Sequence, residues 1–169
     1  MTVVESGMTF KIENEDNLFY IEKSQLYKGL STNSIKIAEF LYLDDKTCNI
    51  IEAKSSSPNP NNNIVRFDEY IEEIKAKFIN AYSIYIANRL QRHTNEDFNE
   101  MQKTFQNLNL KSQTFSFVLI IKEHKTDWLS PISDSLKQRI KVFLKSWNIK
   151  DADVKVLNEE IARDKGFIV

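Results

Sequence analysis

The sequence predicts an α/β fold, of the α+β kind, in which a mixed central β-sheet carries a β-hairpin and is flanked by helices. Three patterns support this fold class. Apolar runs on both sides of a polar turn predict the hairpin at residues 34–56. Apolar residues at three- and four-residue spacing predict a long helix at 66–92. Residues 114–122 are almost continuously apolar, which is typical of a central strand covered on both faces.

The other elements follow from the same patterns. Before the hairpin we expect strands at 8–13 and 18–21, a turn at 14–17, and a short helix at 24–30 that Gly29 ends. After it we expect a loop at 55–63, the long helix, a more polar helix at 96–107, the strand at 114–122, a helix from 133 or 134 to 147, a strand at 154–157 and a helical turn at 159–165. Alternating strands and helices predict crossover connections and a partly parallel sheet.

The hairpin places charged residues on an apolar surface. A turn at residues 44–47 pairs Leu43 with Cys48, Leu41 with Ile50, Glu39 with Glu52 and Ile37 with Lys54, because alternate residues of a strand share a face. Opposed carboxylates destabilise paired strands, and partly buried carboxylates resist ionisation unless a cation compensates. A divalent metal ion would resolve this conflict, since hard cations take carboxylate oxygens as ligands.

The tripeptide Glu52-Ala53-Lys54, with Glu39 one strand earlier, resembles the motif of the PD-(D/E)XK nuclease superfamily, which includes restriction endonucleases. The resemblance implies a restriction-endonuclease-like core, made of the motif hairpin, a crossover helix and another strand. It also implies that Glu39, Glu52 and the backbone carbonyl of Ala53 hold Mg²⁺ or Mn²⁺. Lys54 would position or activate the attacking water. The family usually has a helix before these strands, often with an extra acid, where this sequence offers only residues 24–30.

The residues leave two interpretations of this trio open. In the first, Glu39, Glu52 and Lys54 form the metal site of a nuclease-like domain that hydrolyses DNA phosphodiester bonds, with a protein partner or a homodimer aiding target recognition. In the second, Lys54 neutralises one carboxylate in a structural charge cluster. The chain would then be a non-catalytic accessory subunit of a bacterial multi-protein system. Whether the chain is an enzyme therefore stays open on the sequence alone.

Composition excludes several other classes. With 169 residues, of which 41% are apolar and 28% charged, the chain is expected to form a single domain, residues 1–169. Three glycines are too few for a glycine-rich phosphate loop, and one cysteine allows neither an internal disulfide nor a zinc knuckle. No apolar run approaches the about 18 residues needed to span a bilayer. We expect a cytoplasmic protein that does not bind membranes and, at a net charge of −1, binds DNA weakly alone.

Four further residues are candidates for the surroundings of the site. Lys75 and Lys77 lie on the long helix, and we expect Lys75 to be a solvated residue, with a place beside the site as the alternative. His124 follows the apolar strand, but two histidines in the chain are too few for a zinc site. Trp128 either caps the core or lies in a surface pocket, and the sequence leaves both open.

Overall fold

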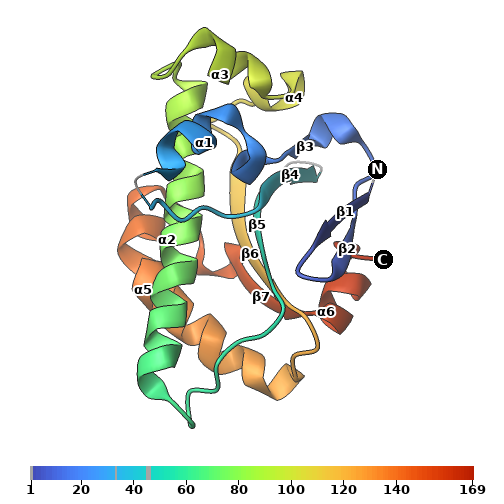
Figure 1. Ribbon diagram of the computed structural model, residues 1–169, viewed down its shortest axis with the longest axis vertical. Coiled ribbons are helices and arrows are strands. Elements are labelled where there is room, and N and C mark those ends of the chain that lie inside the picture. The colour runs from blue at the N-terminus through green and yellow to red at the C-terminus, as the bar shows by residue number, and fades with distance from the viewer. Residues whose placement is uncertain (1, 33, 45–46) are drawn as a thin grey trace.

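The computed structural model describes residues 2–32, 34–44 and 47–169 and has a mixed α/β fold (Figure 1). Its central sheet has five strands: β3 (Leu18–Phe19), β4 (Phe40–Asp44), β5 (Thr47–Lys54), β6 (Thr114–Ile121) and β7 (Val154–Asn158). They lie side by side in the order β3-β4-β5-β6-β7. The first three strands are antiparallel to their neighbours, whereas β5, β6 and β7 are parallel. The predicted mixed sheet with a parallel part is therefore confirmed.

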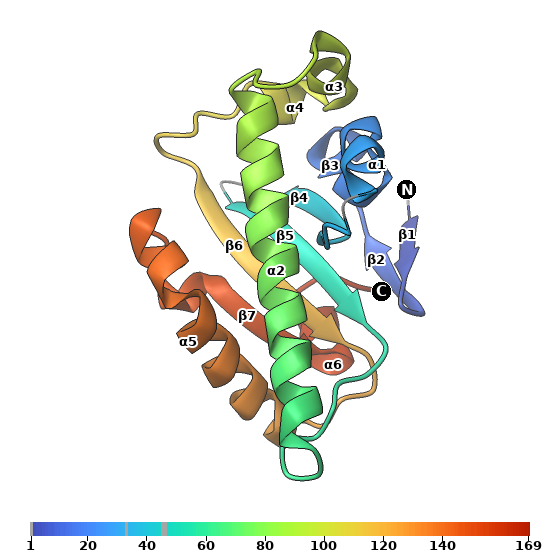
Figure 2. The ribbon, with the colours of Figure 1, turned by 60° about the vertical axis from the view of Figure 1, so that its left-hand side comes forward.

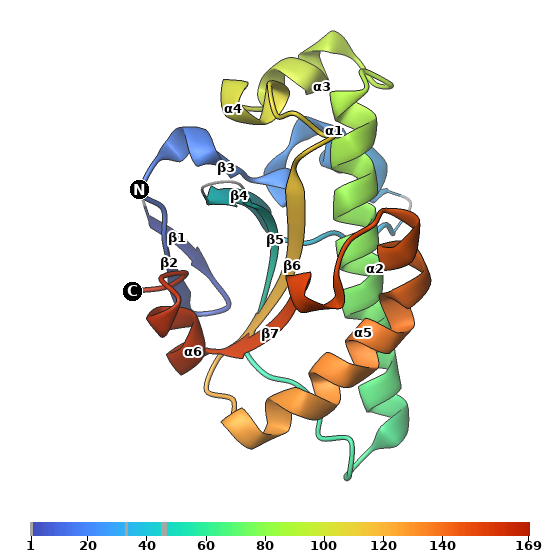
Figure 3. The same ribbon diagram turned by 180° about the vertical axis from the view of Figure 1, so that it is seen from behind.

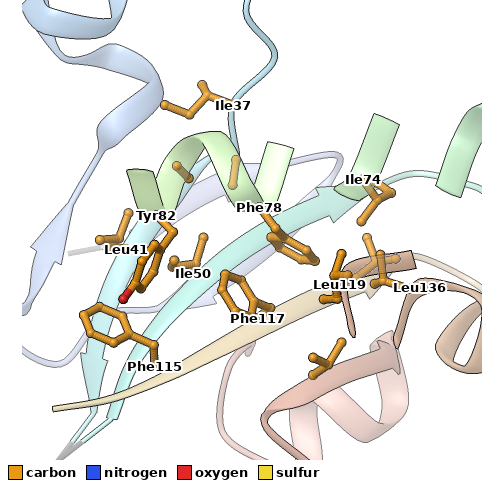
Figure 4. Packing of buried hydrophobic residues seen from close by; sticks show 14 of the residues in the cluster. Ile37, Leu41, Ile50, Ile74, Phe78, Tyr82, Phe115, Phe117, Leu119 and Leu136 are labelled. Carbon is orange, nitrogen blue, oxygen red and sulfur yellow. The ribbon is translucent and has the colours of Figure 1, made fainter. Parts of the chain in front are cut away.

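Two long helices cover one face of this sheet (Figure 2). Helix α2 (Ile64–Arg89) connects β5 to β6, and helix α5 (Leu129–Ser146) connects β6 to β7. The apolar stripe of α2 packs on the middle strands, where Phe78 and Tyr82 contact the ring of Phe117 (Figure 4). The crossovers predicted from the alternation of helices and strands are present, and they place α2 directly over the motif hairpin.

A third layer covers the opposite face of the sheet (Figure 3). It consists of a separate hairpin, β1 (Thr2–Glu5) and β2 (Met8–Lys11), and of the last helix, α6 (Glu159–Asp164). These elements form a second apolar cluster with the sheet, which includes Val118 and Ile120 of β6. Phe117 and Leu119 belong to the first cluster. Strand β6 is thus buried on both faces, as its apolar sequence predicts.

The motif hairpin has the predicted register but a shorter first strand. Leu43 pairs with Cys48 and Leu41 with Ile50, and the ladder ends at Phe40. The prediction that Ile37 pairs with Lys54 is wrong, because residues 35–39 are not in a strand. Two residues of the predicted turn, 45 and 46, lie outside the described residues. At the residue before the ladder, the Glu39 carbonyl accepts the backbone N–H of Glu22 at 3.2 Å.

The N-terminal elements differ most from expectation. The strand predicted at 8–13 ends at Lys11, and the strand predicted at 18–21 keeps two residues before a 3-10 turn (Ile21–Lys23). The predicted turn at 14–17 contains a second 3-10 turn (Glu15–Asn17). The short helix is present as α1 (Gln25–Ser31), but Gly29 lies inside it. The Ser24 side chain accepts the N–H of Tyr27 and so caps its first turn.

Two helices have different limits from those predicted. The helix expected at 96–107 is divided into α3 (Asn95–Glu100) and α4 (Lys103–Gln106), because Met101 between them is extended and buried. Helix α5 begins at Leu129, several residues before the predicted start. Pro131 lies in its first turn, where a missing backbone N–H costs nothing. Trp147 is expected to face the core, yet it is 49% exposed while its ring contacts Tyr82.

Cys48 lies completely buried on β5, and burial raises the pKa of its thiol. A buried thiol of this kind is a small apolar side chain rather than a nucleophile. In the described part of the chain, none of the helices combines the length and the apolar character needed to cross a membrane.

Candidate functional site

Glu39 and Glu52 meet on the side of the sheet that faces α2. Glu52 lies on β5, and no part of its side chain is exposed. Glu39 directly precedes β4 and is also buried. The backbone N–H of Glu39 donates to the carbonyl of Ile51 at 3.1 Å, which keeps Glu39 beside β5. The two carboxylates are therefore close neighbours, as predicted, although they lie at the end of the ladder rather than within it.

A lysine of α2 reaches both carboxylates. The ammonium group of Lys77 lies 2.8 Å from Oε1 of Glu52 and 4.0 Å from Oε1 of Glu39. Lys77 follows Ile74 by three residues and precedes Ala81 by four, so it shares their buried helix face. This spacing is the sequence signal that could have identified it. Lys75, expected as a solvated residue with a place beside the site as the alternative, pairs with Glu72 of its own helix at 3.0 Å and not with the buried carboxylates.

Lys54 connects the buried carboxylates to the surface. Its ammonium group lies 3.3 Å from Oε1 of Glu52 and 2.7 Å from Oε1 of Glu73 on α2. The other oxygen of Glu73 accepts a hydrogen bond from Lys36 at 2.9 Å. Charges of alternating sign thus run from the interior to the surface, where the side chain of Lys54 is 23% exposed.

A cleft of about 900 Å³ lies at this surface, between the loop that follows β5 and the first half of α2. Lys54, Tyr70 and Glu73 line it, together with Lys36 and Arg66. The Tyr70 hydroxyl is buried and has no hydrogen-bond partner among the described residues. Burial, followed by the charges of Glu52 and Glu73, raises the pKa of Tyr70. Of the predicted trio, Lys54 is the residue that a molecule in the cleft would touch.

Glu22 is a third carboxylate at the site, and the sequence reasoning did not include it. It lies on the 3-10 turn that leads into α1, and its backbone N–H donates to the carbonyl of Glu39 at 3.2 Å. The apolar run that ends at Ile21 predicts a strand and hides this turn. The serine N-cap two residues after Glu22 was the available signal.

Burial and mutual repulsion shift the pKa values of these carboxylates. Burial and then the neighbouring carboxylates of Glu22 and Glu52 raise the pKa of Glu39 to about 9. Burial also raises the pKa of Glu52, against the opposing effects of Lys77 and Lys54. By contrast, the hydrogen bond from Lys54 lowers the pKa of Glu73 to about 2. The carboxylates at the buried end are therefore only partly compensated by Lys77 and Lys54, whereas Glu73 at the cleft end is well compensated.

The backbone carbonyl of Ala53, the third predicted metal ligand, already has a partner. It accepts a hydrogen bond from the hydroxyl of Ser6 at 2.9 Å. Ser6 and Gly7 form the tight turn of the β1–β2 hairpin, and both have positive φ angles, of 50° and 73°. A carbonyl oxygen has two lone pairs, so this hydrogen bond leaves one available.

The donor set at the buried end fits a hard cation. Oε2 of Glu52 is buried and has no hydrogen-bond partner in the part of the chain that the structure describes. Buried polar atoms of this kind normally have a partner, such as water or an ion. Carboxylate oxygens are the ligands that Mg²⁺ and Mn²⁺ prefer. Among the described residues, however, no three side chains of His, Cys, Asp or Glu form a ready-made metal cage. The ammonium group of Lys77 lies beside Glu52, so a metal ion bound to this carboxylate would be its neighbour.

Comparisons with protein families, curated proteins and solved structures found no match to this chain.

Proposed function

We propose that this chain is a nuclease-like domain that hydrolyses phosphodiester bonds of DNA with the help of Mg²⁺ or Mn²⁺. The observation that carries the proposal is the meeting of Glu39 and Glu52 beside Lys54 of the acid-x-lysine tripeptide, with Glu22 hydrogen-bonded through its backbone to Glu39. The order of the motif hairpin, helix α2 and strand β6 is the order that the resemblance to PD-(D/E)XK nucleases implies. This order supports a restriction-endonuclease-like core.

In this proposal Glu39 and Glu52 hold the metal ion, with Glu22 next to Glu39 and one lone pair of the Ala53 carbonyl as a further ligand. When bound, the ion polarises the phosphodiester and lowers the pKa of an attacking water. Glu39 would hold the ion as a carboxylate, because a metal ligand must be deprotonated. The raised pKa of Glu39 supports this role, since carboxylates that repel one another favour a divalent cation.

Lys54 contacts the substrate in this proposal. Its ammonium group lines the cleft and is fixed by Glu73 at 2.7 Å, so it is placed before a phosphate arrives. A fixed cation stabilises the negative charge that develops on the phosphate oxygens during the attack. The net charge of −1 gives little general attraction for DNA. A protein partner or a second copy of the chain would therefore supply further contacts.

Lys77 favours a second candidate function. Its ammonium group, 2.8 Å from Glu52, already compensates the buried carboxylate without a metal ion. In this alternative, Glu39, Glu52 and Lys77 form a structural charge cluster, and the chain is a non-catalytic accessory subunit of a bacterial multi-protein system. The two functions differ in what divalent cations do. A metal site gains stability from Mg²⁺ or Mn²⁺ by mass action, whereas a structural cluster does not.

The test compares two lysines that bind the same carboxylate. Wild type, Lys54→Ala and Lys36→Ala are incubated with Mn²⁺ or Mg²⁺ and a mixture of single- and double-stranded DNA. Lys36 is the matched control, because it also lines the cleft and pairs with Glu73. We expect wild type and Lys36→Ala to cleave, and Lys54→Ala to be slower by about 100-fold or more.

Thermal unfolding with and without the same cations completes the test. Wild type should melt at a higher temperature with Mn²⁺ or Mg²⁺, and Glu52→Gln should lose this shift. Absence of both cleavage and a cation-dependent shift in wild type would overturn the nuclease proposal and support the accessory subunit. Equal cleavage by Lys54→Ala and wild type would show that the activity does not come from this site.

A further inference from the structure

A second, smaller pocket lies near the cleft, at the carboxyl ends of the parallel strands. It has a volume of about 150 Å³ and is formed by residues 58–61, after β5, and residues 124–132, after β6. The hydroxyl of Ser57 lies 3.4 Å from Nε2 of His124, so the two segments are in contact. In α/β folds, the ends of parallel strands are the usual place for ligands. Its position therefore marks this pocket as a candidate binding site.

The walls of the pocket combine an aromatic plane with polar groups. Trp128 is 45% exposed, and the ring of His124 meets it edge to face at 5.6 Å between centroids. Ile132 contributes buried apolar surface, and Asn61 and Asp127 bring amide and carboxylate groups. This volume is below the range of pockets for drug-sized ligands, so it suits one flat ring system. Trp128 therefore lies in a surface pocket, which decides between the two places that the sequence left open.

A cation lies next to this aromatic plane. The ammonium group of Lys125 is 4.9 Å from the centroid of the Trp128 ring. An exposed indole beside a lysine is the combination with which proteins bind single-stranded nucleic acids, since the ring stacks on a base and the cation pairs with a phosphate. The pocket, together with the lysine over its tryptophan, therefore offers the two interactions that one nucleotide needs.

The pocket continues into the cleft that contains Lys54. Pro58 lines both, and Ser57 of the cleft contacts His124 of the pocket. A nucleic acid strand bound with one phosphate at Lys54 would thus have a nearby nucleotide at Trp128. The two cavities are therefore neighbours on either side of the loop that follows β5.

We infer that the pocket of Trp128 and His124 binds one unstacked base, so that the preferred ligand is a single-stranded nucleic acid. The inference rests on the proposed function, because it names the substrate class of the same site. A base within a duplex is stacked and paired on both sides and would first have to be flipped out, which costs free energy. Single strands offer their bases without that cost. The chain therefore binds single strands more tightly than duplexes of the same sequence.

The test uses the two tryptophans of the chain. Affinities of wild type, Trp128→Ala, Trp128→Tyr and Trp147→Ala for labelled single- and double-stranded DNA are measured by fluorescence anisotropy without divalent cations. Trp147 is the matched control, because it is 49% exposed and ends α5 at the opposite end of that helix. Trp128→Ala should weaken single-strand binding about five- to 150-fold. Trp128→Tyr, which keeps a stacking ring, and Trp147→Ala should bind nearly as wild type does.

The outcomes separate this inference from the proposed function. Equal single-strand affinity of wild type and Trp128→Ala would overturn the inference, even if wild type cleaves DNA with Mn²⁺. A weaker Trp128→Ala that melts like wild type supports the base pocket, even if no variant cleaves. Absence of measurable single-strand binding by wild type would overturn the inference, whereas the cleavage and thermal-shift assays decide the proposed function. A single-stranded oligonucleotide that lacks one base should bind wild type more weakly than the complete strand does. For Trp128→Ala, the two oligonucleotides should bind with equal affinity.

Discussion

Glu52 is a carboxylate without exposed surface, and its nearest cation is Lys77 at 2.8 Å. Burying one charge is costly unless a partner compensates it, so the two side chains depend on each other. The pattern of the hairpin predicts Glu39, Glu52 and Lys54, because pairing across a short turn is a local property of the sequence. It does not predict Lys77, because this residue lies more than twenty positions after Glu52. Only the packing of helix α2 on the sheet brings its side chain to the carboxylates.

Replacing Lys77 tests this dependence. We expect Lys77→Met to lower the free energy of unfolding by about 3 to 5 kcal/mol, because Glu52 is left buried without its closest partner. Urea denaturation at neutral pH measures the loss. The double variant Glu52→Gln/Lys77→Met should recover a large part of it, since no charge then remains unpaired. A loss below about 1 kcal/mol would mean that water already solvates Glu52.

The raised pKa of Glu39 predicts how stability depends on pH. Its carboxyl group titrates near 4.5 in an unfolded chain and at about 9 in the folded one. Between these values the folded state keeps a proton that the unfolded state has released. Its stabilising contribution is therefore complete below about pH 4.5 and is lost as the pH rises through about 9. The slope for one such group reaches about 1.4 kcal/mol per pH unit.

Urea denaturation between pH 5 and pH 9 measures this decline. Burial raises the pKa of Glu52 in the same direction, whereas the lowered pKa of Glu73, about 2, acts below this range. Glu39→Gln does not titrate, so its stability should fall less steeply than that of wild type. Parallel curves for the two proteins would show that Glu39 is ionised in the folded state at neutral pH.

Helix α2 is the element that assembles both ends of the site. Tyr70, Glu73 and Lys77 follow each other at spacings of three and four residues, so one helix face carries them. This face borders the buried stripe of α2, which includes Ile74 and Phe78. The position of this helix along its axis therefore decides whether Lys77 meets Glu52 and whether Glu73 meets Lys54.

The first turn of α2 is fixed by its N-cap. The side chain of Asn63 accepts the N–H of Arg66 at 3.0 Å. Asn63→Ala should lower the free energy of unfolding by about 1 kcal/mol, because this N–H loses its partner. Asn62→Ala, in the exposed loop just before the cap, serves as the control and should change stability little. Chemical denaturation of both variants checks the difference, and equal losses would show that the cap is not the cause.

Long, strongly patterned elements could be predicted from the sequence, and short ones could not. The limits of α2 and β6 agree with prediction within a few residues, because many residues repeat the same signal. Strand β4 begins at Phe40, directly after a residue whose carbonyl binds the backbone N–H of Glu22 in another element. The break between α3 and α4 depends on the burial of Met101. Tertiary contacts decided these limits, and local sequence does not contain them.

At the scale of the whole molecule, the third layer was the least predictable part. The backbone N–H of Lys11 donates to the carbonyl of Phe167 at 3.0 Å, and Phe10 forms an isolated bridge with Ile168. These contacts join the first hairpin to the residues after α6. Contacts between residues this distant in sequence produce no local sequence pattern from which they could be predicted. The fold class, by contrast, follows from the order of the long, clearly patterned helices and strands.

The charge distribution predicts weak and moderately salt-sensitive binding of DNA. Lys36, Lys54 and Arg66 line the cleft, but Glu69, Glu72 and Glu73 line it as well. A single strand with two or three neutralised phosphates gives a slope of about −1.4 to −2.1 for log affinity against log salt. Anisotropy titrations between 50 and 200 mM salt, a range over which such slopes are resolved, measure it. A slope near zero would show that no phosphate is bound.

Because Cys48 is buried, the rate at which a reagent modifies its thiol reports how often the sheet opens. This single cysteine lies on β5, opposite Leu43 of β4 on one side and Phe115 of β6 on the other. A thiol reagent can reach it only when these strands separate, so the modification rate measures that opening in unaltered protein. Any ligand that binds only the closed form slows the reaction in proportion to its occupancy. Cations and oligonucleotides can thus be ranked as ligands without labelling the chain or waiting for turnover.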